Sequence, residues 1–190
     1  MKRMLLPATI VALFTALPAS AELETFTVDP NHTFPAFEIG HFGFSLQRGR
    51  FNKTTGKVTL DIAAKQGSAD IAIDTGSVST GHAKLEEHLR SEDFFNSAKN
   101  PQMTFKSNNF AFEGDKVKSA SGDLTINGVT RPVTLKADQF NCAPHPMLKK
   151  KACGAELTTT IKRSDFGIKT FLPAVADDVM LRINVEAIKD

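Results

Sequence analysis

Apolar and polar residues alternate along most of the chain, a period of two that is typical of β-strands with one buried face. Phe26 and Val28 begin the pattern, and Leu181, Ile183 and Val185 continue it near the C-terminal end. The alternating positions fall in the segments 26–28, 37–41, 58–62, 69–73, 103–105, 110–112, 124–126, 133–137, 157–161 and 179–187. About eight strands with hairpin connections predict an all-β antiparallel fold in one domain, either a sandwich or a closed barrel.

Turn-forming residues separate these strands. Asn127-Gly128 lies between two alternating segments and is the strongest short hairpin signal in the chain. Glu113-Gly114-Asp115 predicts a second hairpin turn. The alternation changes phase between Phe105 and Phe110, which predicts a β-bulge near residues 107–109.

The segment 82–95 departs from the alternating pattern. Its sequence, HAKLEEHLRSEDFF, is rich in helix formers, and Leu85 and Leu89 are four residues apart, on one face of a helix. We predict a short helical insertion over residues 82–95 that packs on the β-structure or plugs it.

The first 21 residues have the features of a secretory signal peptide. Lys2 and Arg3 precede an apolar stretch, and Ala19-Ser20-Ala21 supplies a small-x-small cleavage site. The apolar stretch of residues 4–17 is too short to cross a bilayer as an uncleaved helix. We therefore predict cleavage after Ala21, a mature domain of residues 22–190, no stable membrane anchor and, because the signal resembles a bacterial one, a periplasmic location.

Export affects how the two cysteines are interpreted. Cys142 and Cys153 are eleven positions apart, and in an oxidising compartment the simplest prediction is one disulfide. A metal-binding or redox-active pair is the alternative, although the spacing is not that of a C-x-x-C motif.

The charge balance argues against a nucleic-acid partner. The chain has 23 basic and 21 acidic residues, and loss of Lys2 and Arg3 leaves 21 of each. A domain without excess positive charge has little electrostatic attraction for a phosphate backbone.

The aromatic residues are all of one type: 15 Phe, with no Trp and no Tyr. Their number exceeds what strand alternation requires, so they predict a large apolar interior, which is either a plain core or a lined pocket. A pocket walled by Phe and aliphatic residues suits a long hydrocarbon, because each buried CH₂ group contributes about 0.8 kcal/mol.

Two groups of residues in the helical insertion have side chains capable of metal binding or catalysis. His82 and Glu86 share a helix face, but His88 points elsewhere, so a zinc site would lack convergent ligands. A Ser91–His88–Asp93 triad falls in one short stretch with no G-x-S-x-G elbow. We expect neither a metal site nor catalysis.

Several ordered motifs carry a resemblance to a known family. They lie at residues 28–32, 41–44, 48–51, 80–81, 87–95, 101–105, 122–130 and 163–167. Together they make the mature sequence similar to the YceI-like family, bacterial exported proteins that bind polyisoprenoid lipids. The segment 140–154 also resembles a subgroup with a disulfide-tied loop, some members of which bind a ubiquinone-type lipid.

The resemblance implies an eight-stranded antiparallel, lipocalin-like β-barrel with a helical insertion and an elongated apolar cavity. It implies no catalysis and no cofactor beyond a bound isoprenoid or quinone lipid. The residues expected to line the cavity are Phe37, Phe42, Phe51, Leu89, Phe94, Phe95, Phe105, Phe112 and Phe166. His41, His88, Arg90 and Arg163 also match family motifs, and we favour a structural hydrogen-bond network for them over headgroup contact.

The leading hypothesis is a periplasmic carrier of a long-chain isoprenoid lipid, polyprenyl or ubiquinone-type. One alternative is an enzyme that acts on a lipid or amide with His88, Arg90 and Asp93. Another is an interaction protein that docks through the basic loop Lys149-Lys150-Lys151. A membrane-protein lipid donor or acceptor and a homodimer are both compatible with the carrier hypothesis.

Overall fold

The computed structural model describes residues 23–190, so the predicted signal peptide lies outside the described residues. The strands are β1 (Glu24–Val28), β2 (Phe34–His41), β3 (Ser45–Phe51), β4 (Thr54–Asp61), β5 (Gln66–Asp74), β6 (Val78–Ser79), β7 (Gln102–Glu113), β8 (Lys116–Ile126), β9 (Val129–Pro144), β10 (Lys151–Lys162) and β11 (Val175–Lys189). The helices are α1 (Ala83–Arg90) and two 3₁₀ turns, η1 (Thr75–Ser77) and η2 (Arg163–Phe166). In the part of the chain that is described, no helix has the length and apolar character needed to cross a membrane.

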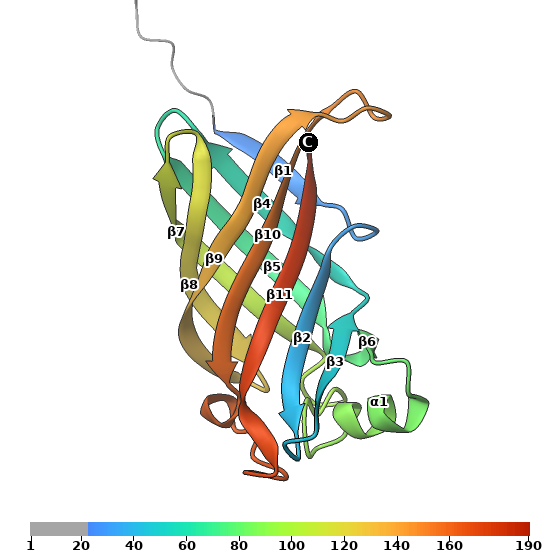
Figure 1. Ribbon diagram of the computed structural model, residues 1–190. Coiled ribbons are helices and arrows are strands. Elements are labelled where there is room, and N and C mark those ends of the chain that lie inside the picture. Colours follow the sequence, from blue (N-terminus) through green and yellow to red (C-terminus); the bar gives the residue numbers. More distant parts are fainter. Residues whose placement is uncertain (1–22) are drawn as a thin grey trace, which may run out of the picture.

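The strands form one antiparallel sheet that closes on itself (Figure 1). The ring runs β1-β4-β5-β7-β8-β9-β10-β11, and β11 returns to β1 through pairs such as Phe26 with Lys189. The predicted eight-stranded antiparallel barrel is therefore confirmed. Closure removes the exposed edges that an open sheet of this size would present.

At the end of the barrel that carries α1, the same sheet continues through three further strands, β2, β3 and β6. β11 pairs with β1 at its C-terminal end and with β2 over Val175–Asn184. β3 and the short β6 then follow β2, and α1 lies beside β6 at the lower end of Figure 1. The alternating pattern did not predict β3. Only Phe51 of its seven residues is buried, so the strand has no regular apolar face in its sequence.

The helical insertion is shorter than predicted. α1 covers Ala83–Arg90, and residues 91–95 are turns. His82 Nδ1 accepts the Leu85 amide at the start, and the Ser91 hydroxyl donates to the His88 carbonyl at the end. These local bonds compete with helix continuation and define the two ends.

The predicted bulge and hairpin are both confirmed. The register between β7 and β8 shifts between Ser107 and Asn109. Gly122 faces this irregularity, where a Cβ atom would lie 2.2 Å from the Lys106 carbonyl oxygen, so only glycine fits. At the other end of β8, Asn127 and Gly128 have φ values of 52° and 75°, as a tight hairpin turn requires.

The buried apolar side chains inside the barrel form two clusters. The larger one contains Phe51, Phe105 and Phe166 and extends to Leu89 of α1. The smaller one, toward the other end, contains Phe26, Leu60 and Cys153. The predicted pairing of Cys142 with Cys153 is present as a disulfide across directly opposed positions of β9 and β10.

Candidate ligand-binding cavity

A cavity of about 540 Å³ lies inside the barrel at the end that carries α1. This end is the lower one in Figure 1 and is called the lower end below. Its walls come from the inward faces of eight strands, from α1 and from the segment that joins β10 to β11. The strands are β2, β3, β5, β7, β8, β9, β10 and β11. The lining is almost entirely apolar, because inward positions alternate with solvent-facing polar ones along each strand.

The structure brings eight of the nine predicted lining residues to this cavity. They are Phe37, Phe42, Phe51, Leu89, Phe94, Phe95, Phe105 and Phe166. Their role in binding a ligand stays a prediction, because the geometry gives only their position.

Phe112 does not line the cavity, so the prediction that it does is wrong. A second shift in register falls between Ala111 and Phe112, near the far end of β7. The Phe112 side chain packs on the smaller core cluster, with Lys65 Nζ 6.0 Å from the ring centroid. A second irregularity in the strand could not be recognised from the sequence, where Phe110 and Phe112 continue one alternation.

Sequence reasoning also missed part of the wall. Many of the missed residues are aliphatic and lie on strands that the alternation predicts, including Ile39, Ile126, Ile161 and Leu181. Phe171 had no such signal, because it lies in the irregular segment before β11.

The mouth of the cavity is an aromatic cluster. The His88 ring contacts Phe94 and Phe171 edge-on at centroid distances of 5.0 and 5.9 Å, and His41 contacts Phe42 at 4.5 Å. Phe42 and Phe171 line the cavity while half of each side chain remains exposed. Both have positive φ, at 51° and 63°, a conformation that is uncommon for bulky residues and concentrates at functional sites.

The residues of the hypothetical catalytic triad are not arranged for nucleophilic catalysis. His88 Nε2 lies 2.9 Å from Asp93 Oδ2. The Ser91 hydroxyl instead donates to the His88 backbone carbonyl at 2.8 Å. Arg90, the other residue of the enzyme hypothesis, does not belong to the cavity wall.

The hypothetical zinc ligands of α1 have other partners. His82 caps the helix, and a Glu86 carboxylate oxygen accepts the amides of Thr80 and Gly81 at 2.7 and 3.0 Å. These amide bonds hold the pKa of Glu86 below its usual value. His82 and Glu86 therefore stabilise the start of the insertion, whereas His88 lies in the last turn of α1 beside Asp93.

Arg163 is buried at the lower end of the cavity. Its guanidinium donates to three backbone carbonyls, those of Ile168, Val175 and Ala176, at 2.9 to 3.2 Å. Burial lowers the pKa of Arg163, but a guanidinium remains charged at any physiological pH. These bonds fasten the segment before β11 to η2, in agreement with the structural role that we favoured.

A smaller cavity of about 120 Å³ lies above the first. Phe26, Leu60, Phe110 and Ala187 contribute to its wall. Five residues line both cavities, so the two are neighbours along the barrel.

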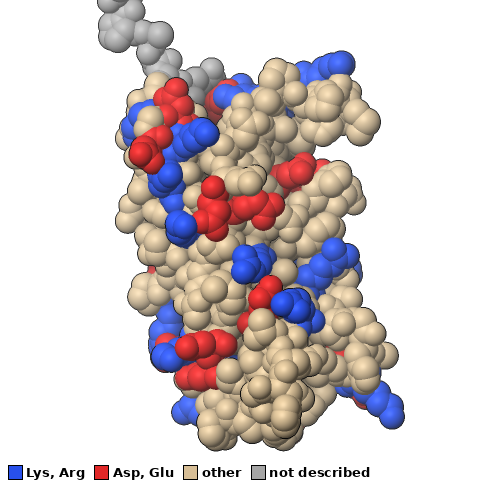
Figure 2. Space-filling model, viewed as in Figure 1, with Lys and Arg blue, Asp and Glu red and all other residues tan. Residues whose placement is uncertain are grey.

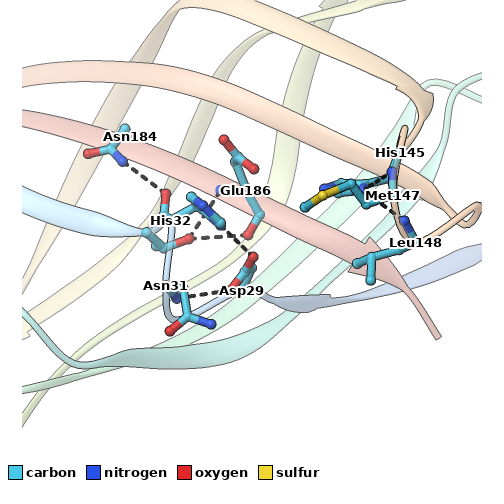
Figure 3. A network of polar contacts seen from close by, with 9 residues as sticks. Asp29, Asn31, His32, His145, Met147, Leu148, Asn184 and Glu186 are labelled. Atoms are coloured by element: carbon cyan, nitrogen blue, oxygen red, sulfur yellow. Dashed lines mark hydrogen bonds and ion pairs between the residues drawn. The ribbon is translucent and has the colours of Figure 1, made fainter.

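A cluster of polar residues lies on the outside, where the turn between β1 and β2 meets β11 (Figure 3). His32 Nδ1 is 2.7 Å from Asp29 Oδ2, and Glu186 lies close enough that the three residues could hold a metal ion. These three residues were not among the predicted site residues. Its His–Asp bond already has a local function, because it closes the turn that interrupts the barrel strand.

The basic loop lies at the other end of the molecule from the mouth, at the tip of the β9–β10 hairpin (Figure 1). Lys149 donates to the Pro146 carbonyl at 2.6 Å, and Lys151 forms an ion pair with Glu24. His145 Nδ1 accepts the amides of Met147 and Leu148, which shapes the tip (Figure 3). Two of the three lysines are thus bonded within the chain.

The visible face of the molecule mixes both signs of charge. Figure 2 shows basic and acidic side chains interspersed over the strands. Elsewhere in the described residues, basic and acidic side chains are paired across neighbouring strands, as in Lys106 with Asp70 and Lys162 with Asp178. This face offers no extended basic surface to a nucleic acid.

Comparison with known proteins gives a consistent result. A family model described as a YceI-like domain matches residues 26–187. Protein YceI of Escherichia coli O157:H7 is 41% identical over 193 residues, covering 100% of this chain and 99% of that protein. The crystal structure of Burkholderia cenocepacia BcnA matches with a TM-score of 0.72 and 26% identity, covering 84% of this chain and 98% of its own. A polyisoprenoid binding domain from Saccharophagus degradans, implicated in plant cell wall breakdown, matches with a TM-score of 0.65 and 17% identity, covering 89% of this chain and 100% of its own.

Proposed function

Because the chain belongs to the YceI-like family, we propose that it binds a long-chain isoprenoid lipid in its barrel and carries it through the periplasm. The polyisoprenoid binding domain of Saccharophagus degradans, which has the same fold, supports this class of ligand. The lipid is polyprenyl or ubiquinone-type, and the function involves no turnover.

The apolar interior is the observation that carries the proposal. Phe, Leu and Ile side chains from eight strands and α1 surround a cavity of about 540 Å³. An isoprenoid chain has no hydrogen-bonding groups, so it can fill such a space without leaving a buried polar group unpaired. Burial of each CH₂ group contributes about 0.8 kcal/mol, so a long chain binds without polar contacts.

The headgroup lies at the mouth in this proposal. Gln47 and Arg48 supply polar atoms in the cavity wall near the mouth. A quinone or alcohol oxygen can accept hydrogen bonds from such groups, while the chain points toward the closed interior.

A carrier is favoured over an enzyme because the chemically capable groups near the cavity have structural partners. His88 lies beside Asp93, Ser91 bonds the helix end, and Arg163 bonds three carbonyls. Among the described residues, the side-chain hydrogen bond of His88 is made with Asp93 and not with a hydroxyl or thiol that could act as a nucleophile.

The periplasmic part of the proposal rests on the N-terminal sequence and on the disulfide. Residues 1–21 carry the signal-peptide pattern, with cleavage after Ala21. The bond between Cys142 and Cys153 belongs to an oxidising compartment. The lipid then passes between membranes, with membrane proteins as donor or acceptor.

The test is organic extraction of the mature protein purified from its native periplasm, followed by mass spectrometry of the extract. We expect a stoichiometric polyprenyl or quinone species. A folded protein that yields no lipid, and takes up none from prenol-containing vesicles, would refute the proposal.

Two substitutions locate the site. Phe94→Asp places a charge in the cavity wall and should lower lipid retention at least about tenfold, because the carboxylate must be desolvated. Phe112→Asp is the matched control, a half-buried Phe outside the cavity. Equal losses in the two variants would contradict the assignment of the site.

A further inference from the structure

The two cavities of the barrel share a common boundary. Pro35, Ile73, Phe105, Leu135 and Ile183 line both of them, and we call these five residues the belt. The belt therefore separates a large lower chamber of about 540 Å³ from an upper chamber of about 120 Å³.

The belt is built by the closure of the barrel. Its members come from five different strands, β2, β5, β7, β9 and β11. Pro35 and Ile183 are direct partners across β2 and β11, so their side chains lie on the same, inner face. Phe105 pairs with Ile71, two residues from Ile73, which places Phe105 and Ile73 diagonally on neighbouring strands.

The belt is tightly packed. Ile73, Phe105 and Leu135 are each at most 7% exposed and belong to the main core cluster. Phe105 has the largest side chain of the five, and its ring lines both chambers. An apolar chain that enters from the mouth meets this ring before it reaches the upper chamber.

The upper chamber is suited to the same kind of ligand. Phe26, Leu60 and Ala187 in its wall are at most 4% exposed. Its surface is as apolar as that of the lower chamber. Only packing at the belt, and not chemistry, distinguishes the two spaces for a hydrocarbon.

We infer that the belt sets the length of isoprenoid chain that this protein accepts, with Phe105 as the residue that determines the limit. A chain that fits the lower chamber binds with the belt closed. A longer chain must displace the Phe105 ring from its packed position or leave its end in water. This inference rests on the proposed lipid-binding function and specifies its substrate range.

The experiment is a competition among polyprenols of graded length. The delipidated mature protein is incubated with an equimolar mixture, re-isolated, and its bound prenols are quantified by mass spectrometry. We expect the wild type to enrich shorter chains. In Phe105→Ala the ratio of the longest to the shortest bound prenol should rise roughly tenfold or more, the change given by burying about two further CH₂ groups.

Phe51→Ala is the matched control. Phe51 is as buried as Phe105, at 5% against 6% exposed, but it lines only the lower chamber. Its substitution adds the same volume without opening the belt, so the length ratio should stay at the wild-type value. An equal shift in both variants would overturn the inference, because total volume would then set the length.

Two further variants keep the test decisive. Phe105→Leu keeps a large apolar side chain and leaves a smaller gap, so it should give a smaller shift in the same direction; it replaces Phe105→Ala if that variant does not fold. Adding Ala120→Leu to Phe105→Ala fills the upper chamber, whose wall includes Ala120, and should restore the preference for short chains. An unchanged length ratio in every variant refutes the belt, whereas a wild type that binds no prenol refutes the proposed function instead.

Discussion

At the scale of single residues, the polar groups of this chain are largely used to hold its turns. Asp29 illustrates this, since one carboxylate oxygen accepts the Asn31 amide at 2.9 Å and the other contacts His32. The hydrogen bond with Asp29 raises the pKa of His32, and the same bond lowers the pKa of Asp29. The turn that separates β1 from β2 is therefore stabilised by a pair that responds to pH.

This pair predicts a pH-dependent stability. The folded pKa of His32 lies above its unfolded value near 6.5, so its contribution is complete below that value and is lost as the pH rises through the folded pKa. Asp29 behaves in the opposite way, and its contribution is lost as the pH falls below about 3.8. We expect the urea midpoint of the wild type to be lower at about pH 8 than at about pH 6, with a smaller difference in His32→Gln.

Asp29→Asn provides the companion measurement. The amide oxygen can still accept the Asn31 amide, but the negative charge beside His32 is gone. This variant should also lose the His32 contribution to the pH dependence. If both variants keep the wild-type difference between the two pH values, another group is responsible.

At the scale of elements, the lower end of the barrel depends on how the β10–β11 connection is fixed. This connection is irregular between η2 and β11, and Phe171 at the mouth belongs to it. The Arg163 guanidinium donates hydrogen bonds to carbonyls at both ends of this connection, that of Ile168 at one end and those of Val175 and Ala176 at the other. Asp177 complements this by accepting the amide and hydroxyl of Ser164.

Arg163→Met should therefore destabilise the protein. The thioether side chain fills similar volume but donates no hydrogen bond, so three carbonyls lose their partner, and we expect a loss of about 2 to 4 kcal/mol in the free energy of unfolding. Urea denaturation measures the loss, and hydrogen exchange should show reduced protection of amides in residues 168–176. Arg131→Met is the control, since Arg131 is exposed on β9 and should change stability by less than about 0.5 kcal/mol. Equal stability of the two variants would contradict the role of Arg163.

At the scale of the whole molecule, the two ends of the barrel differ in what they expose. Around the mouth, Phe42, Phe44, Leu46 and Phe171 are each at least 50% exposed. At the opposite end, Met147 and Leu148 are exposed at the tip of the β9–β10 hairpin, beside the lysines (Figure 1). Exposed apolar groups of this kind mark interaction sites, and those at the mouth adjoin the cavity.

We predict that the apolar rim of the mouth speeds lipid uptake. Phe44 is 91% exposed, so Phe44→Ser should leave stability unchanged while slowing prenol transfer from phospholipid vesicles by up to about tenfold. Stopped-flow transfer of a fluorescent prenol measures the rate. Met147→Ser, at 81% exposed on the other end, is the control and should transfer at the wild-type rate. A slower rate in the control alone would place uptake at the hairpin end.

Much of the fold follows from the sequence because strand patterns are local. The period of two, the Asn127-Gly128 turn and the change of phase before Phe110 each depend on neighbouring residues, and the structure contains all three features. The pairing of the two cysteines could be predicted for the same reason, because Cys142 and Cys153 lie opposite each other in one hairpin. The features that were missed have weak local signals, namely the exposed strand β3 and the early end of α1 at Arg90.

The sequence by itself determined which residues face inward, but only the tertiary structure decided at which level of the barrel each one lies. Phe105 and Phe112 belong to the same strand, yet one lines the cavity and the other lies beyond a second irregularity. The belt joins residues as distant in sequence as Pro35 and Ile183, because closure of the sheet brings β2 beside β11. Alternation depends on the two faces of a strand and contains no information about closure, register or depth, which arise from pairing between distant strands.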